Sequence, residues 1–428
     1  MRLHRRAFLA ASAAIALARP AFAQAPEPGA PTFGGRGGRV IRVTTLSPTG
    51  PGSITEAIKA KGKRIIVFEV GGVIDLAMKS LRIDEPFITI AGQTAPAPGV
   101  TFIRGGFTLR GNDALIQHIA VRPGEAGQAK KSGWECDGIS AYAADNIMVE
   151  NCSITWATDE GLSASGPRFG VEEKGATVAE WRAGTSSNIL FRRNLVAEGL
   201  SNSTHSKGEH SKGSLIHDNV RNAVITASLY AHNMERNVLF KGGTQGEVRF
   251  NVMYNPGKRF THYNLHEGEW GEHAWQTGRL EIRENVYRAG PSTDSKAAAF
   301  MLGGEGNLEL DMHDNYAFDS KGAPLAQYGT FGPKTAKLID LKGEAARINP
   351  KAADEAAKNL TSIVLDACGA RPWDRDTIDA RIVGDVRAGA GKIIDSEQDV
   401  GGYPVRKETH APFVEAEWNL DTMERKKA

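Results

Sequence analysis

The segments Asn146-Ile-Met-Val-Glu-Asn-Cys-Ser-Ile154 and Asn188-Ile-Leu-Phe-Arg-Arg-Asn-Leu-Val196 share one pattern, and this shared pattern decides the fold. Each has a short apolar run followed by an asparagine close to its end. The form apolar-x-apolar-x-x-Asn, loosely kept, recurs further along the chain in Ser214–Val220, Ser228–Asn233, Glu247–Val252, Leu280–Val286 and Leu308–Asn315. Repeat units of tens of residues are typical of a solenoid.

We predict that each repeat is a coil of an all-β, right-handed, single-stranded parallel β-helix. One coil cannot bury its inward side chains alone, whereas stacked coils bury a continuous core. Asparagine suits the turns because it tolerates left-handed backbone geometry, and its amide can bond to the asparagine of the next coil. A single asparagine would indicate only an ordinary turn, but a series after matching strands favours the solenoid.

The β-helix is expected to cover residues 39–330, with peripheral loops between short runs bounded by Gly, Pro or Asp. One early segment, Gly52–Ala60, has helical spacing and a capping box formed by Ser53 and Glu56. After Asn315 the repeats fade. Residues 331–428, with short helices near 351–358 and 376–386, are expected to pack on the solenoid and cap its end rather than form a second domain.

The N-terminus reads as a targeting signal. Arg5-Arg6-Ala-Phe-Leu9 is a twin-arginine pattern, an apolar run follows, and Ala21-Phe-Ala23 has the form of a cleavage site. We expect residues 1–23 to be a twin-arginine-type export signal and 24–38 a linker, so that the protein is periplasmic or secreted. The alternative is an ordinary secretory signal. No other stretch is apolar enough for a membrane anchor.

Composition excludes some classes of partner. The 428 residues carry a formal net charge of +2, but without the four arginines of the first 23 residues 48 basic residues face 50 acidic ones. A near-neutral mature chain argues against nucleic-acid binding. The three cysteines, Cys136, Cys152 and Cys368, are too few for a disulfide framework and are expected to be buried free thiols in strands. We expect a monomer.

Four acids form the first candidate cluster. Glu135 and Asp137 are two residues apart and would face the same way on a strand, whereas Asp159 and Glu160 are adjacent, so that a regular strand would direct only one of them to the same place. With water and a substrate carboxylate, three such side chains could complete a Ca²⁺ shell. The alternatives are a solvated acidic wall and a pair of carboxylates for hydrolysis.

A cationic cluster follows in the sequence, and it suits a polyanion lying along a groove. Its members are Lys207, Lys212, Arg236, Lys241, Lys258 and Arg259. Three histidines lie among them, His205, His210 and His232, and each is a rival candidate for a general base.

These motifs together resemble the pectate lyase family, the first family of polysaccharide lyases. The resemblance is carried by Asp137–Ser140, Asn151–Ser163, His210–Ile216 and His232–Asn237, and Asp374–Pro404 is also similar to exported bacterial members. It implies a parallel β-helix, Ca²⁺, and cleavage of polygalacturonate by β-elimination to unsaturated oligogalacturonides.

The resemblance also implies roles for individual residues. The calcium ligands of the family fall on Glu135, Asp137 and Asp159, with Glu160 as a neighbour that could substitute. The catalytic arginine falls on Arg236, and the substrate-binding positions on Lys212, Lys241 and the motif residue His210. Two departures are visible: Ser163 stands where many members have a further acid, and Val238-Leu239 stands where similar members have Pro-Arg.

Other activities remain open at this point. They are a lyase for another uronate or for methylated pectin, a β-helix hydrolase with paired acids, and a catalytically silent carbohydrate-binding solenoid. If Arg236 is the base, activity is expected to rise at alkaline pH, because a free guanidinium has a pKa of about 12.5 or more.

Overall fold

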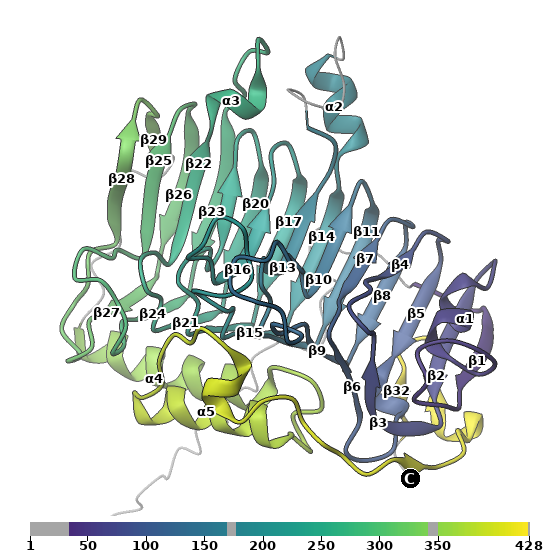
Figure 1. The fold of residues 1–428 in the computed structure, drawn as a ribbon. Coiled ribbons are helices and arrows are strands. Elements are labelled where there is room, and N and C mark those ends of the chain that lie inside the picture. Colours follow the sequence, from purple (N-terminus) through teal and green to yellow (C-terminus); the bar gives the residue numbers. More distant parts are fainter. Residues whose placement is uncertain (1–33, 169–176, 341–349, 427–428) are drawn as a thin grey trace, which may run out of the picture.

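The computed structural model describes residues 34–168, 177–340 and 350–426. In these residues the chain winds as a solenoid, and each coil adds one strand to each of three long sheets (Figure 1). The strands pair in parallel along all three sheets, except for one short antiparallel strand, β30, at the edge of the third. The predicted fold class, a parallel β-helix, is therefore confirmed.

The three sheets are named here by their numbers of described strands. The eleven-strand sheet contains β1 (Arg39–Val43), β2 (Arg64–Phe68), β5 (Ile88–Ala91), β8 (Ala114–Gln117), β11 (Asp145–Glu150), β14 (Ser187–Arg192), β17 (Arg221–Thr226), β20 (Gln245–Arg249), β23 (Gly278–Arg283), β26 (Leu308–His313) and β29 (Leu338–Asp340). The nine-strand sheet contains β4 (Leu81–Ile83), β7 (Phe107–Leu109), β10 (Ile139–Tyr142), β13 (Glu160–Ser165), β16 (Lys212–Ile216), β19 (Leu239–Lys241), β22 (Thr261–Leu265), β25 (Phe300–Gly304) and β28 (Tyr328–Lys334). The ten-strand sheet contains β3 (Val70–Asp75), β6 (Val100–Ile103), β9 (Ala120–Arg122), β12 (Ser153–Thr155), β15 (Leu195–Ala197), β18 (Leu229–Ala231), β21 (Val252–Tyr254), β24 (Val286–Arg288), β27 (Tyr316–Phe318) and β30 (Thr409–His410).

The two segments that define the repeat lie on neighbouring coils. Ile147 pairs with Ile189 and Glu150 with Arg192, in parallel register. Alternate residues of each strand point inward, so that Ile147, Val149, Ile189 and Phe191 all lie in the central core. The sequence repeat is therefore the structural repeat.

An asparagine ladder joins the coils at the corner between the eleven-strand and ten-strand sheets. The Asn285 side-chain oxygen accepts a hydrogen bond from the Asn251 backbone N–H at 3.0 Å, and the Asn315 oxygen accepts from Asn285 N–H at 3.1 Å. The predicted amide bonding between coils is thus present. The left-handed conformation falls on the asparagine itself at Asn151 and Asn219, as predicted, but on the residue before the asparagine at Phe250 and Glu284.

The N-terminal end of the solenoid is closed by α1 (Ile54–Lys59), whose residues Ile54 and Ile58 are part of the central core. The Ser53 hydroxyl accepts a hydrogen bond from the Glu56 backbone N–H, which forms one half of the predicted capping box. At the other end, β28 and β29 continue the sheets to Asp340, beyond the boundary at 330 that the fading repeat suggested. Their exposed positions lack the apolar pattern that marks the earlier coils.

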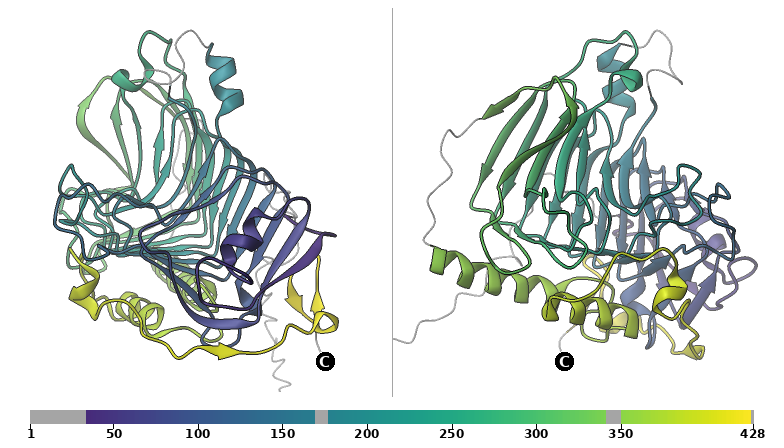
Figure 2. Two further views of the ribbon diagram at one scale, coloured as in Figure 1. Left: turned by 45° about the vertical axis from the view of Figure 1, so that its right-hand side comes forward. Right: turned by 60° about the vertical axis from the view of Figure 1, so that its left-hand side comes forward.

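The C-terminal segment lies along the outside of the ten-strand sheet (Figure 2). The helices α4 (Pro350–Ala367) and α5 (Thr377–Ala388) place Leu360, Val364 and Ile382 in a second core cluster with Leu195 and Leu229 of the sheet. This sheet is therefore buried on both faces, as parallel sheets commonly are. After α5 the chain runs back toward the N-terminal end, where β30 pairs antiparallel with β3.

The remaining elements are short. They are α2 (Val178–Gly184), α3 (Glu267–Trp270), the 3₁₀ turns η1 (Gly92–Thr94), η2 (Glu397–Val400) and η3 (Glu415–Glu417), and the hairpin strands β31 (Trp418–Asn419) and β32 (Glu424–Arg425). The cysteines Cys136, Cys152 and Cys368 are buried free thiols as predicted, but they lie outside strands. None of the helices in the described ranges is long and apolar enough to cross a membrane. The predicted export signal at 1–23 and most of the linker at 24–38 lie outside the described residues.

Candidate active site

The candidate residues come from loops that precede strands of the nine-strand sheet. The loop 123–138 leads into β10, residues 156–159 into β13, 198–211 into β16 and 232–238 into β19. Because parallel strands begin at one edge of a sheet, these loops lie side by side along one outer edge of the solenoid. Acids from the earlier coils therefore meet cations from the later ones, as the sequence predicted.

Three carboxylates form a compact group, which we call the acid group: Asp137, Asp159 and Glu160, with one oxygen from each within 4.8 Å of the others. Asp137 is held in place by the Glu160 backbone N–H at 3.1 Å and by the Ser163 hydroxyl at 3.0 Å. Both members of the adjacent pair join the group, because Asp159 precedes the first residue of β13 and is not bound by strand alternation.

The electrostatics of the acid group fit a hard cation. Burial, together with the charge of Asp159, raises the pKa of Asp137 to about 7. Burial would raise the pKa of Asp159 as well, but the hydrogen bond from His210 and the charges of His210 and Arg236 outweigh it and lower that pKa. Three convergent oxygen donors that repel one another are the donor set that Ca²⁺ prefers, and water and substrate oxygens would complete the coordination.

Glu135 lies near the acid group but is not one of its members among the described residues. Its side chain is exposed, and it accepts hydrogen bonds from the Ser206 hydroxyl and from the Ser206 backbone N–H, the latter at 3.1 Å. The residues 133–137 form no strand, so the predicted shared face of Glu135 and Asp137 does not arise. Contact with Ser206 lowers the pKa of Glu135, which therefore stays charged.

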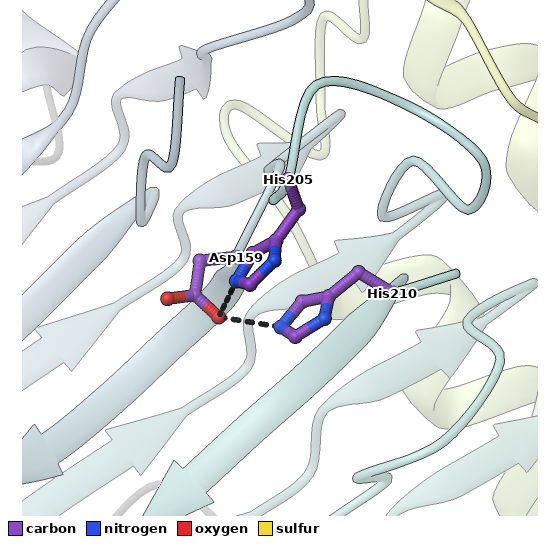
Figure 3. A group of neighbouring side chains, drawn as sticks. All are labelled: Asp159, His205 and His210. Carbon is purple, nitrogen blue, oxygen red and sulfur yellow. Dashed lines mark hydrogen bonds and ion pairs between the residues drawn. The ribbon is translucent and has the colours of Figure 1, made fainter. Parts of the chain in front are cut away.

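Two histidines stack beside the acid group (Figure 3). The rings of His205 and His210 lie 3.6 Å apart at 12°. His210 Nε2 is 2.7 Å from Asp159 Oδ1, and His205 Nε2 is 3.8 Å from the same oxygen. His205 Nδ1 accepts a hydrogen bond from the Lys207 backbone N–H at 3.1 Å, which leaves its proton on Nε2. Burial lowers the pKa of His205, and the neighbouring His210 adds to this effect.

Arg236 reaches the acid group from the loop before β19. Its Nη1 donates a close hydrogen bond to the carboxylate of Glu160. Burial lowers the pKa of Arg236, whereas the charges of Asp159 and Asp137 oppose that shift. The predicted base and the predicted ligands therefore occupy one site, and the guanidinium does not point into the interior.

Lys212 lies next to this site as the first residue of β16, and an unpredicted acid holds it. The Lys212 ammonium and the Arg259 guanidinium both contact the carboxylate of Glu235, which is largely buried. Arg259 also stacks over the Phe331 ring, 4.4 Å from its centroid. Burial, followed by the charges of Arg259 and Lys258, lowers the pKa of Lys212 to about 7. In the sequence, only the position of Glu235 next to Arg236 could have indicated that Glu235 contributes to the site.

Lys241 ends β19 and lies in a second acidic group. It contacts Glu269 of α3, and its Nζ is 3.7 Å from Asp218 Oδ2. Asp218 is fully buried and accepts a hydrogen bond from Trp270 Nε1 at 2.8 Å. Burial lowers the pKa of Lys241 to about 8, although Asp218 opposes this.

The other predicted cations contribute less. Lys258 is half exposed and pairs with Glu209, and Lys207 is exposed. His232 is buried beneath Gly391 and its Nδ1 contacts the Asn255 amide at 2.9 Å, so it does not face the acid group. A cavity of about 780 Å³ lies elsewhere, between Trp373, Phe250 and Trp418, and none of the candidate site residues lines it.

The sequence relatives of this parallel β-helix identify the class of protein to which it belongs. No model of a protein family matches the chain. It is 30% identical over 395 residues to a probable pectate lyase C of Emericella nidulans, covering 89% of this chain and 80% of that protein. It is 28% identical over 396 residues to a probable pectate lyase C of Aspergillus terreus, covering 89% and 81%. The chain therefore belongs to the pectate lyase family.

Solved structures match less closely. The cedar pollen allergen jun a 1 aligns with a TM-score of 0.46 at 14% identity, over 78% of this chain and 91% of that one. Pectate lyase II from Xanthomonas campestris aligns with a TM-score of 0.42 at 14% identity, over 81% and 98%.

Proposed function

We propose that this protein cleaves polygalacturonate by calcium-assisted β-elimination and releases unsaturated oligogalacturonides. The observation that carries the proposal is the contact between Arg236 and Glu160, which joins a basic group to the acid group. Lys212 and Lys241 start and end the next two strands of the same sheet, so fixed positive charge flanks this contact.

The chemistry requires removal of the proton at C5 of a uronate, next to its carboxylate. Asp137, Asp159 and Glu160 would hold Ca²⁺, which when bound supplies Lewis-acid stabilisation of the charge that develops on the substrate carboxylate. Lys212 and Lys241 would bind substrate carboxylates and add positive charge where the transition state is most anionic. His210 orients Asp159 through its hydrogen bond at 2.7 Å.

Arg236 is the proposed proton acceptor. The C5–H bond breaks as its proton passes to the guanidine nitrogen, the electron pair forms the C4–C5 double bond, and the C4–O bond breaks. The departing oxygen of the neighbouring sugar then takes up a proton, so no water is consumed. Because only a neutral guanidine can accept a proton, turnover should rise with pH above neutrality.

One assay tests the proposal. The protein is incubated with polygalacturonate, with and without a chelator, and the absorbance of the unsaturated product is followed. A rise that the chelator abolishes supports the proposal. New reducing ends without that absorbance would indicate hydrolysis by paired carboxylates, and binding without cleavage would indicate a silent solenoid. A neutral or acidic optimum would favour His210 or a carboxylate over Arg236 as the base.

A lyase for methyl-esterified pectin is the second candidate. Leu215 and Leu239 pair in register on the outer face of the nine-strand sheet, next to Ser163 on the preceding strand. These two apolar side chains could pack against a methyl ester, and Ser163 offers no charge to a metal. Comparing rates on esterified and unesterified polymer with and without Ca²⁺ distinguishes the two candidates.

We also propose that the protein acts as a monomer after export, in the periplasm or outside the cell, with an anionic polysaccharide as its partner. The twin-arginine pattern at Arg5-Arg6 supports export. Replacing both arginines by lysine should retain the protein in the cytoplasm if the signal is of the twin-arginine type.

A further inference from the structure

The segment that follows α5, residues 389–403, contacts two loops that border the acid group. The first loop, 123–138, contains Glu135 and Asp137, and the second, 198–211, contains His205 and His210. Neither loop contains helix or strand, so sheet hydrogen bonds do not fix its conformation. Their shape depends on contacts with neighbouring loops of the same edge, with each other and with the segment 389–403.

Asp395 and its neighbour hold the second loop. Asp395 Oδ1 accepts hydrogen bonds from the backbone N–H of Asn202 at 2.9 Å and from its side-chain amide at 3.2 Å. The Ser201 backbone N–H donates to the Ile394 carbonyl at 2.9 Å, and the Ser201 carbonyl accepts from the His210 N–H at 2.9 Å. Since His210 contacts Asp159 at 2.7 Å, a short chain of contacts leads from this segment to the acid group.

Glu397 and Tyr403 hold the first loop. Glu397 is 2% exposed, and its Oε2 accepts a hydrogen bond from the Glu125 backbone N–H at 2.9 Å. The Tyr403 hydroxyl accepts from the Ala126 N–H at 3.1 Å and donates to the Pro123 carbonyl at 2.6 Å. These contacts fix the start of the loop 123–138, which carries Asp137 near its end.

The two loops are also joined directly. The Glu125 carboxylate accepts a hydrogen bond from the Ser203 hydroxyl at 2.9 Å. The backbone N–H groups of Lys131 and Gly133 donate to the carbonyls of Ser203 and Thr204, both at 2.9 Å. A displacement of either loop from the segment 389–403 would therefore disturb the other loop, and with it Asp137 of the acid group and His210, which contacts Asp159.

We propose that residues 389–403 position the two loops beside the acid group, with Asp395 and Glu397 as positioning residues that act through Asn202 and Glu125. This inference rests on the proposed calcium site and identifies the residues that would hold the loops beside that site. Groups that orient metal ligands without touching the metal commonly set its affinity. The C-terminal segment would then be part of the active site's framework as well as a cover for the ten-strand sheet.

The test compares Asp395→Ala and Glu397→Ala with the conservative variants Asp395→Asn and Glu397→Gln, which keep the accepting oxygen. Arg387→Ala is the matched control, because it removes an exposed ion pair with Asp366 at the end of α5 and touches neither loop. Calcium affinity is measured by calorimetry on the full chain. The alanine variants should bind Ca²⁺ roughly three- to tenfold more weakly, less than the ~10–100-fold typical of groups that contact a ligand directly.

The dependence of the lyase rate on Ca²⁺ concentration gives a second measurement, which a loss of stability alone would not change. The lyase rate of the alanine variants should return toward the wild-type rate at saturating Ca²⁺, and the conservative variants should behave as wild type throughout. Unchanged calcium affinity in both alanine variants would overturn the proposal. If an alanine variant fails to fold, Tyr403→Phe replaces it, since the ring keeps its contact with Trp156 at 6.0 Å and only the hydroxyl is lost.

A second measurement separates failure of the proposed calcium site from failure of the positioning proposal. If the wild-type protein binds no Ca²⁺, hydrogen exchange decides the positioning proposal alone. The amides of residues 123–138 and 198–211 should then exchange faster in Asp395→Ala than in Arg387→Ala. Equal exchange rates would contradict the positioning proposal.

Discussion

The guanidinium of Arg236 contacts the carboxylate of Glu160 across 76 residues of sequence. The register of the coils explains how: Glu160 pairs with Lys212 on the next strand, and Lys212 in turn pairs with Glu235, the residue before Arg236. The contact therefore spans two coils of the solenoid. The regular stacking of the coils alone therefore brings the proposed base to the proposed metal ligands, and no additional helix or strand is needed.

Arg236→Lys should abolish turnover and leave the fold intact. Lysine keeps the positive charge but loses the planar fork that reaches Glu160, and its ammonium is a poor replacement at a site built for a guanidine. The value of kcat should fall by at least ~100-fold, the usual contribution of a general base. Circular dichroism and Tm should stay at wild-type values, as should the activity of Arg279→Lys, an exposed control on β23 of the eleven-strand sheet.

Asp159→Asn should weaken calcium binding by at least about tenfold, because it removes the negative charge of a proposed ligand while keeping an oxygen that can accept from His210. A ligand that binds only the folded state stabilises the folded protein by roughly 2.7 kcal/mol when the ligand concentration is a hundred times the Kd. Calcium should therefore raise the Tm of the wild-type protein and of Asp421→Asn, a remote surface control. A Tm of Asp159→Asn that responds to Ca²⁺ as the wild type does would contradict the assignment.

Much of the fold could be predicted because the β-helix repeats one energetic unit. The inward alternation of Ile147 and Val149 and the recurrent asparagines report directly on coil stacking. The strands β28 and β29 escaped prediction because the last coil has no following neighbour and exposes residues such as Tyr328 and Ile339. The left-handed turn position was predicted only in part, since asparagine adopts it at Asn151 and Asn219, whereas other residue types, including Phe250 and Arg193, adopt it in other coils.

The site was less predictable where loops replace strands. Asp137, Asp159 and Glu160 come together because each lies at or near the first residue of a strand, where coil register decides position. Glu135 follows no such register, and its partner Ser206 lies 71 residues away in a different loop. The Glu235 bridge depends on Arg259 of the following coil, which the sequence pattern near Lys212 does not contain.

Glu235→Ala should destabilise the fold. The change leaves the Lys212 and Arg259 charges, which are mostly buried, without their shared counter-charge. Breaking a buried ion pair on one side costs about 3–5 kcal/mol, and the partial exposure of Arg259 places the expected loss near ~2–3 kcal/mol. Denaturant unfolding measures it. Glu209→Ala, which breaks the half-exposed pair with Lys258, should cost less than about 1 kcal/mol.

His118 should make stability depend on pH in the acidic range. Burial between Trp373 and Arg371, aided by the charges of Arg371 and Arg193 and opposed by Glu150, lowers its pKa from 6.5 to about 4. Between these values the unfolded chain binds a proton that the folded one does not, so stability falls as the pH drops from 6.5 toward 4.

The measurement compares wild type with His118→Gln by urea unfolding at pH 7.5 and pH 5. The free energy of unfolding of the wild type should fall by about 1–2 kcal/mol more than that of the variant over this interval, because only the wild type has a titrating side chain at position 118. Equal losses would show that His118 binds its proton as readily in the folded state.

Asn285→Ala should show how much the asparagine ladder contributes. Asn285 is fully buried, its oxygen accepts from the Asn251 N–H at 3.0 Å, and its amide donates to the Val248 carbonyl at 2.9 Å. Alanine leaves those partners buried and unsatisfied, at roughly 1–3 kcal/mol for each group, so a loss of about 3 kcal/mol or more is expected in urea unfolding. Asn222→Ala removes an exposed asparagine from β17, on an earlier coil, and should change stability by less than about 0.5 kcal/mol. Similar small changes in both variants would mean that core packing alone holds the coils in register.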